Sequence, residues 1–236
     1  MHRFLCPEAP FVAGGEITLS PDESHHLVHV MRLFPGETVS LADGRGKTAV
    51  AILLTCAARG ARVRVESVSE STTPSSRVRL AFGIPKPAAL EFILRRATEV
   101  GVELFQPLVT QHSLAMNSWN DRRWGKIILE VCKQCQETRF PEILAPVPLE
   151  RWLGAREARR LLVLCDEEQR NASRNWRNDV SGYDLLIGPE GGWSREEVAW
   201  LERSGAAVMG LGNNRLRAET AALVATVLVK KQIGEI

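Results

Sequence analysis

After residue 77 the chain alternates short, almost continuously apolar runs with segments of helical periodicity. The apolar runs cover residues 78–84, 104–110, 161–165, 184–187 and 206–211. Strands that are apolar on both faces and alternate with helices are typical of a parallel sheet covered by helices on both sides. This pattern predicts an α/β fold with a mostly parallel sheet for residues 77–236.

The first 72 residues follow a different pattern, which predicts a small β-barrel. Short alternating or apolar runs at 16–19, 37–41, 47–55 and 61–68 are separated by turn residues, and one short helix is expected over 22–31. Residues 70–76 contain no apolar side chain, which is typical of a linker. We therefore expect two domains, 1–72 and 77–236.

Composition excludes several classes of protein. There are 30 Lys and Arg against 28 Asp and Glu, so a nucleic-acid partner would need a local basic patch. No apolar run approaches the roughly 18 residues that cross a bilayer, and the start lacks the apolar stretch of a signal peptide. The 5 cysteines are scattered and odd in number, which argues against a disulfide framework. These features predict a cytoplasmic protein with no membrane partner.

The segment LLIGPEGGWS at residues 185–194 is the first candidate ligand site. A strand ends, a glycine-rich turn follows and a capped helix begins, and ligands of open α/β sheets bind at such strand ends. Gly188, Gly191 and Gly192 would let the backbone approach a ligand closely, although a plain tight turn explains them equally well. The segment lacks the ending of a phosphate-binding loop, and no dinucleotide-binding glycine motif follows the first strand.

A second turn of the same design lies at residues 210–220, GLGNNRLRAET. Here too a strand ends in glycines and a helix follows a polar turn. Arg215 and Arg217 lie at a helix N-terminus, where the helix dipole disfavours cations, so a further interaction should justify them. Two glycine turns that leave neighbouring strands could hold a small molecule between them.

Taken together, these segments resemble the bacterial 16S rRNA (uracil-1498-N3)-methyltransferase family, which belongs to the SPOUT superfamily of knotted methyltransferases. The resemblance covers nearly the whole chain, in the order and spacing of its motifs. The matching segments are HLVHVMR at 26–32, PGE at 35–37, Asp43-Gly44, Lys86, Glu91, ATEVGV at 97–102, CKQC at 132–135, RFPEI at 139–143, and the two glycine turns.

The resemblance implies an N-terminal PUA-like barrel that binds RNA and a C-terminal domain with a deep trefoil knot that binds S-adenosylmethionine. It also implies a homodimer whose substrate is 16S rRNA or the small ribosomal subunit. By family match, the cofactor site is formed by two turns and the end of a third strand. Its residues are Leu164, Cys165, Ile187, Gly188, Pro189, Glu190, Gly191, Gly192, Leu211, Gly212, Asn213, Leu216 and Arg217.

The implied reaction requires uracil N3 to lose its proton as it attacks the sulfonium methyl group. Negative charge then spreads onto the ring oxygens, where a fixed guanidinium would stabilise it. Arg217 is the candidate for this role. Glu190 is a candidate base, or a carboxylate that only orders its loop.

The RNA-binding residues implied by the same resemblance are Arg3, His26, Arg32, Lys86, Arg96 and Arg139. The chain departs from the family pattern at Gln136-Glu137, Asn214 and Ala218, which affects expected RNA contacts more than cofactor binding. Two basic clusters, 122–126 and 156–160, could contact RNA or simply be solvated.

Other patterns carry less weight. The cysteines of CKQC at 132–135 are expected to pack within a helix, and His25 and His29 lack further metal ligands, so no metal site is expected. Two alternatives stay open: methylation of another RNA at a ribose 2′-oxygen or another base, and a non-catalytic RNA-binding assembly factor.

Overall fold

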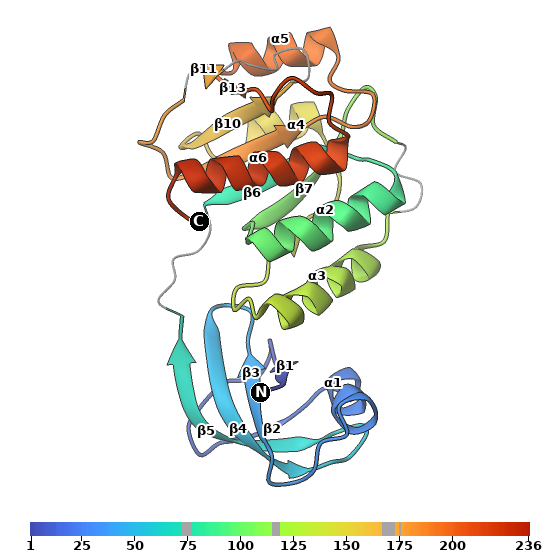
Figure 1. Cartoon of the computed structure of the whole chain (residues 1–236), viewed down its shortest axis with the longest axis vertical. Coiled ribbons are helices and arrows are strands. Elements are labelled where there is room, and N and C mark those ends of the chain that lie inside the picture. Colours follow the sequence, from blue (N-terminus) through green and yellow to red (C-terminus); the bar gives the residue numbers. More distant parts are fainter. Residues whose placement is uncertain (72–76, 115–118, 167–172, 175) are drawn as a thin grey trace. The chain divides into compact units, whose positions relative to one another are not determined.

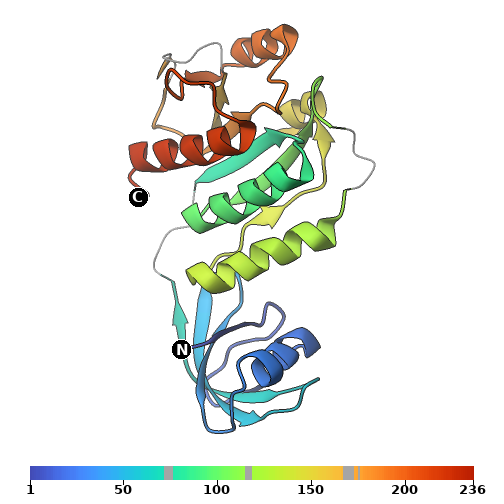
Figure 2. The ribbon, with the colours of Figure 1, turned by 45° about the vertical axis from the view of Figure 1, so that its right-hand side comes forward.

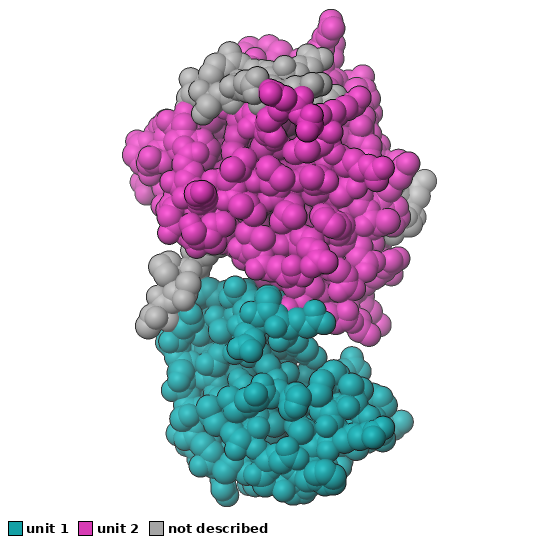
Figure 3. Space-filling model, in the orientation of Figure 1, with its two compact units in different colours: residues 1–75, 132–140 teal, residues 76–131, 141–236 magenta. Residues whose placement is uncertain are grey.

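A computed structural model describes residues 1–71, 77–114, 119–166, 173–174 and 176–236, with backbone only for Ser173–Arg174. The chain forms two compact units, one of residues 1–75 with 132–140 and one of residues 76–131 with 141–236 (Figure 3). Residues 72–76 of the expected linker lie outside the described residues.

The first unit is built on a five-stranded sheet in the order β1-β3-β4-β5-β2 (Figure 1). Its strands are β1 (Arg3–Leu5), β2 (Glu16–Thr18), β3 (Thr38–Ala42), β4 (Lys47–Thr55) and β5 (Arg62–Glu70). β1 pairs with β3 in parallel, and the other neighbours are antiparallel. Alternate side chains of β4 and β5 enter the core, which is why period-two alternation predicted these strands.

The helix expected over 22–31 is α1 (Pro21–His25), which continues as the π-helix η1 (His26–Val30). The Ser20 side chain caps α1 by accepting the Glu23 N–H at 3.2 Å. In η1 the Met31 N–H reaches the His26 carbonyl at 2.9 Å, five residues back. Arg32 then leaves the helix with a φ of 52°, a backbone conformation unusual for a residue with a side chain.

Residues 132–140, which include the last turn of α3 (Asp121–Cys135), belong to the first unit. Lys133 forms an ion pair with the buried Glu23 of α1. Backbone hydrogen bonds join Gly46 N–H to the Thr138 carbonyl at 2.9 Å and Phe140 N–H to the Gly44 carbonyl at 2.9 Å. The chain therefore returns to the first unit after the second has begun.

The second unit contains a mostly parallel sheet in the order β11-β13-β10-β12-β6-β7-β8, with β9 paired to β7. Among the described strands of this sheet, β11 alone runs antiparallel to its neighbour. The strands are β6 (Val78–Gly83), β7 (Leu104–Val109), β8 (Glu142–Ile143), β9 (Val147–Pro148), β10 (Arg160–Cys165), β11 (Ser173–Arg174), β12 (Gly182–Ile187) and β13 (Ala207–Met209).

Helices cover this sheet on both faces, as the continuously buried strands β10 and β12 require. α2 (Pro87–Val100) and α6 (Ala218–Gln232) pack side by side over β6 and β12 (Figures 1 and 2). α4 (Leu149–Ala155) and α5 (Arg195–Arg203) contribute Leu149 and Leu201 to a core that includes Leu164 and Leu186. The α/β architecture predicted from the apolar runs is confirmed.

Candidate functional site

A cavity of about 580 Å³ lies where the carboxyl ends of β6, β10, β12 and β13 meet. This edge of a parallel sheet is where α/β proteins bind ligands. The lining residues are Lys86, Ala88, Ala89, Cys165, Asp166, Ile187, Gly188, Pro189, Glu190, Gly192, Trp193, Leu211, Gly212, Asn214, Arg215, Leu216, Arg217, Ala218, Glu219 and Ala221.

The first glycine turn follows β12 and packs against the end of β6. A Cβ on Gly83 would lie 2.4 Å from Pro189 Cδ, so only glycine allows the two segments to touch. Gly192 has a φ of 71°, and its N–H donates to the Pro189 carbonyl at 2.8 Å to close the turn. A Cβ on Gly188 would lie 3.2 Å from the Gly192 backbone. Glycine is thus required here for close backbone packing.

Glu190 joins two walls of the cavity. Its Oε1 accepts the backbone N–H of Lys86 at 2.9 Å, where Lys86 is the residue that caps the start of α2. The carboxylate satisfies an N–H at the positive end of that helix, a favourable position for an anion. Glu190 therefore has a clear positioning role in this structure.

The outer side of the turn is supported by the loop that follows β7. His112 Nδ1 lies 3.3 Å from the Gly192 carbonyl, and a Cβ on Gly191 would come within 2.8 Å of His112 Cβ. Glu197 accepts the Gln111 N–H at 2.9 Å and also forms the expected capping box with Ser194 at the start of α5. These contacts hold the turn in place from outside the cavity.

The second glycine turn connects β13 to α6. Gly212 has a φ of 99°, and a Cβ there would meet no atom within 4 Å. Arg217 is the N-cap residue of α6, but its side chain makes no capping hydrogen bond. Arg217 is exposed and lines the cavity at the N-terminus of α6, where the sequence pattern placed it.

The third wall is the end of β10. Burial, and secondarily the neighbouring Asp166, raise the pKa of the Cys165 thiol to about 12, so the thiol stays protonated near neutral pH. The Cys165 carbonyl accepts the indole N–H of Trp193 at 3.3 Å, which links this strand to the first turn.

Most of the residues expected to form a cofactor site line this one cavity, but three do not. Leu164 is fully buried in the core beneath α4 and α5, because alternate residues of a strand point to opposite faces. Gly191 and Asn213 are exposed and lie in the turns without lining the cavity.

Sequence reasoning did not select several lining residues. Asp166 directly follows a buried strand, and Ala88 and Ala89 begin the helix that follows β6, so strand ends were the signal that could have found them. Trp193, Asn214, Ala218, Glu219 and Ala221 also line the cavity, as does Arg215, which the sequence pattern singled out at the helix N-terminus without assigning it to the cofactor site. Lys86, expected to contact RNA, lies here as well.

The other expected RNA-binding residues are spread over both units. In the first unit Arg3 donates to the Gln136 carbonyl, and Arg139 donates to the Arg45 carbonyl at 2.7 Å. Arg32 is exposed there, whereas His26 is half-buried. In the second unit Arg96 pairs with Glu99 at 2.7 Å.

Two further properties concern ligands and membranes. Within the described residues, no group of three or more His, Cys, Asp or Glu side chains is placed to hold a metal ion. None of the helices in the same part of the chain has the length and apolar character needed to span a membrane.

Comparison with known proteins gives matches over both parts of the chain. Residues 72–230 match a family model described as an RNA methyltransferase domain, and residues 19–65 match one described as an RNA methyltransferase PUA domain. The chain is 32% identical to ribosomal RNA small subunit methyltransferase E of Synechocystis sp. over 91% of this chain and 72% of that protein. It is 26% identical to the protein of the same name from Bacillus subtilis, over 91% and 90% of the two chains.

Solved structures show the same fold. A ribosomal RNA small subunit methyltransferase E from Neisseria gonorrhoeae, bound to S-adenosyl methionine, has a TM-score of 0.90 at 24% identity and covers 98% of both chains. A putative methyltransferase from Legionella pneumophila, in complex with SAM, has a TM-score of 0.84 at 27% identity, covering 98% of this chain and 97% of that one.

Proposed function

The chain belongs to the ribosomal RNA small subunit methyltransferase E family, RNA methyltransferases with a PUA domain, and we propose that it methylates N3 of a uridine in 16S rRNA. The methyl donor is S-adenosylmethionine. The observation that carries the proposal is the cavity between two glycine turns, with Arg217 at its edge.

The cavity residues fit this cofactor. Gly188, Gly192 and Gly212 present backbone rather than side chains to the cavity, so a flat adenosine group can lie against them. Lys86 supplies positive charge for a carboxylate, whereas Asp166 and Glu219 supply acceptors for an ammonium group or ribose hydroxyls. S-adenosylmethionine, when bound, supplies an electrophilic methyl group.

Within this site we assign Arg217 the catalytic role. Arg217 is exposed and lines the cavity, so its guanidinium can donate hydrogen bonds to the uracil oxygens as negative charge develops on them. Glu190 is assigned a positioning role, because its carboxylate already accepts the Lys86 N–H. Water close to N3 can then accept the proton.

The test is methyl transfer from labelled S-adenosylmethionine to small ribosomal subunits that lack the modification, with the product nucleoside identified. We expect N3-methyluridine at a single position. A ribose-methylated product, or cofactor binding without transfer, would refute the assigned reaction and favour another RNA or an assembly role.

Arg217→Ala tests the catalytic assignment within the same assay. Removal of one donor that stabilises developing charge lowers kcat by about 10²–10³-fold. We expect this loss while S-adenosylmethionine still binds, and partial recovery with Arg217→Lys, which keeps the charge. An Arg217→Ala enzyme with the wild-type kcat would remove Arg217 from the mechanism.

We further propose a homodimer. Helix α6 is apolar almost all round, and Leu223, Val224, Val227 and Leu228 remain half-buried or exposed in the single chain. An apolar face of this kind is typical of an interface, and a second copy of α6 is its simplest partner. Sedimentation analysis should give a dimer for the wild type and a monomer for Leu228→Glu.

The remaining parts of the proposal concern topology and location. We propose domains at 1–72 and 77–236, with residues 132–140 of the second grouped with the first unit, and a trefoil knot in the second domain. β12 lies between β10 and β6, and the chain returns from β13 to pack α6 against α2, which supports a threaded C-terminus. A substrate in the small ribosomal subunit supports a cytoplasmic location.

A further inference from the structure

A second cavity, of about 590 Å³, lies at the opposite edge of the sheet from the cofactor cavity. It opens at the amino ends of β10 and β12, where Arg156, Arg159, Arg160 and Arg177 all line it. Among the described residues of this lining, Asp179 is the only one with a carboxylate. Nothing in the proposed methyl transfer uses these arginines.

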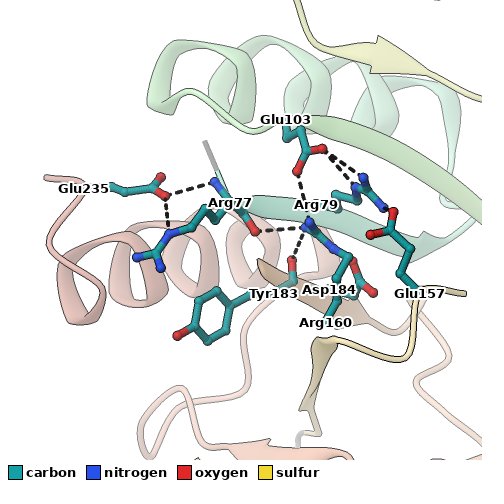
Figure 4. Close-up of polar contacts among 8 residues, drawn as sticks. All are labelled: Arg77, Arg79, Glu103, Glu157, Arg160, Tyr183, Asp184 and Glu235. Carbon is teal, nitrogen blue, oxygen red and sulfur yellow. Dashed lines mark hydrogen bonds and ion pairs between the residues drawn. The ribbon is translucent and has the colours of Figure 1, made fainter. Parts of the chain in front are cut away.

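Arg160 is fully engaged within the protein (Figure 4). Its side chain is 4% exposed and contacts Asp184 at 2.8 Å and Glu103 at 3.3 Å. A further nitrogen donates to the Arg77 carbonyl at 2.9 Å. Arg160 thus fixes the amino edge of the sheet and is not available to a ligand.

The nearby carboxylates outside the cavity lining are engaged as well. Arg79 binds Glu103 at 2.9 Å and Glu157 at 2.7 Å, and Asp184 is held by Arg160 (Figure 4). Because Arg160 and Arg177 are themselves paired with carboxylates, the remaining positive charge of the lining is carried by Arg156 and Arg159.

The other arginines make contacts within the protein that use only some of their N–H donors. The Arg156 guanidinium donates to the carbonyls of Arg160 at 3.0 Å and Glu157 at 3.3 Å. Arg177 binds both oxygens of Asp179 at 3.1 Å. Arg159 is exposed and has no acidic partner in the part of the chain that the structure describes. An arginine carries five N–H donors, so these contacts leave several for a ligand.

We propose that this cavity, defined by Arg156, Arg159 and Arg177, binds phosphate groups of the RNA backbone. A guanidinium group can donate two parallel hydrogen bonds to two oxygens of one phosphate. Ser181 and Ser204 in the same lining add hydroxyl donors. The inference rests on the proposed function, because it takes the rRNA substrate as the source of the phosphate.

The position of the cavity defines which part of the RNA it contacts. The 6 residues of β10 separate the two edges of the sheet and span about 20 Å. A strand of RNA whose target uridine lies at the cofactor cavity therefore reaches the arginines several nucleotides away. The cavity orients the substrate and has no direct contact with the reacting base.

The experiment measures binding of a fluorescent fragment of 16S rRNA as a function of salt. The test variant is Arg159→Ala/Arg177→Ala, and the control is Arg151→Ala/Arg203→Ala, which removes two exposed arginines of the same unit that do not line the cavity. Each phosphate contact to a single strand contributes about 0.7 to the slope of log K against log salt. Two lost contacts therefore reduce the slope by about 1.4 and weaken binding roughly 25-fold at about 0.1 M salt.

We expect this loss in the test variant alone, with S-adenosylmethionine affinity and thermal stability unchanged. Equal losses in both variants, or none in the test variant, would overturn the proposal. Competition by inorganic phosphate at constant ionic strength, without any loss of RNA affinity in the variant, would show a free-anion site instead. A wild-type protein that binds RNA but transfers no methyl group would overturn the proposed function and leave this inference standing.

Discussion

Gly83→Ala tests whether close packing between β6 and the first glycine turn forms the cofactor cavity. Gly83 is buried at the end of β6, and its φ is not in the left-handed region, so alanine brings a steric change alone. The added Cβ would lie 2.4 Å from Pro189 Cδ and 2.9 Å from Pro189 N. Because carbon atoms pack at about 3.5 Å, the turn must move by roughly 1 Å.

The magnitude follows from that displacement. Overpacking of this kind costs about 1–3 kcal/mol, which lowers Tm by about 2–12 °C for a unit of this size. The cofactor requires the undisplaced turn, so its affinity should fall by about 5- to 150-fold, measured by calorimetric titration with S-adenosylmethionine.

Gly154→Ala is the matched control. Gly154 lies within α4, and a Cβ there would meet no atom within 4 Å. Alanine should stabilise that helix by about 0.5–1 kcal/mol and leave cofactor affinity unchanged. If Gly83→Ala bound the cofactor as tightly as Gly154→Ala and melted at the same temperature, the reasoning about this turn would be wrong.

Three further predictions concern Glu190, His26 and the cysteines. Glu190→Ala loses the hydrogen bond to the Lys86 N–H and should weaken S-adenosylmethionine binding about fivefold. Glu190→Gln keeps an acceptor, so its cofactor affinity and kcat should equal those of the wild type. A large loss of kcat in Glu190→Gln would instead indicate that Glu190 is the catalytic base. Burial, with a contribution from Lys133, lowers the pKa of His26, so the folded state binds fewer protons than the unfolded state below about pH 6.5. The free energy of unfolding should therefore fall as the pH drops through this range. The difference in Tm between pH 7.5 and pH 5.5 should be smaller for His26→Gln than for the wild type. An equal difference in the two proteins would show that His26 does not cause the pH dependence. Burial raises the pKa of the Cys6, Cys132 and Cys165 thiols to about 12. A thiol reagent at pH 8 should therefore label the exposed Cys135 in the native protein, and the three buried thiols only after unfolding. Rapid labelling of Cys165 in the native protein would contradict its burial.

Local periodicity predicted the long strands and helices of both units but not the shortest strands. β8, β9 and β11 have 2 residues each, too few to show any alternation. β1 was missed too, whereas β2 and β13, which like β1 have 3 residues, lie within longer apolar or alternating runs. The end of α1 was also missed, because η1 differs from an α-helix only in the partner of each N–H. The formation of very short strands and the change from α-helix to π-helix depend on tertiary packing rather than on the residue pattern.

The same distinction applies to the site. The glycine turns were recognisable because glycine itself marks close backbone approach, and Arg217 because it opposes the dipole of α6. The bond between Glu190 and Lys86 was not predictable, since the two residues are 104 positions apart and meet only because β12 inserts beside β6. Strand order is a property of the tertiary structure and cannot be deduced from the spacing of residues along the chain.

The separation of charge across the sheet follows from that strand order. At the carboxyl edge two of the strands end in glycine turns, and the cofactor cavity there is lined by glycines together with a few charged side chains. At the amino edge the buried Arg160 needs Asp184 and Glu103 to offset its desolvation, because an unpaired charge in this position would cost several kcal/mol. Gly182 is required there too, since a Cβ would lie 2.3 Å from Arg160 Nη1. Replacing Arg160 would leave Asp184 and Glu103 without their partner and disturb the segment that carries Arg156 and Arg159. The RNA-binding test therefore replaces exposed arginines and keeps Arg160.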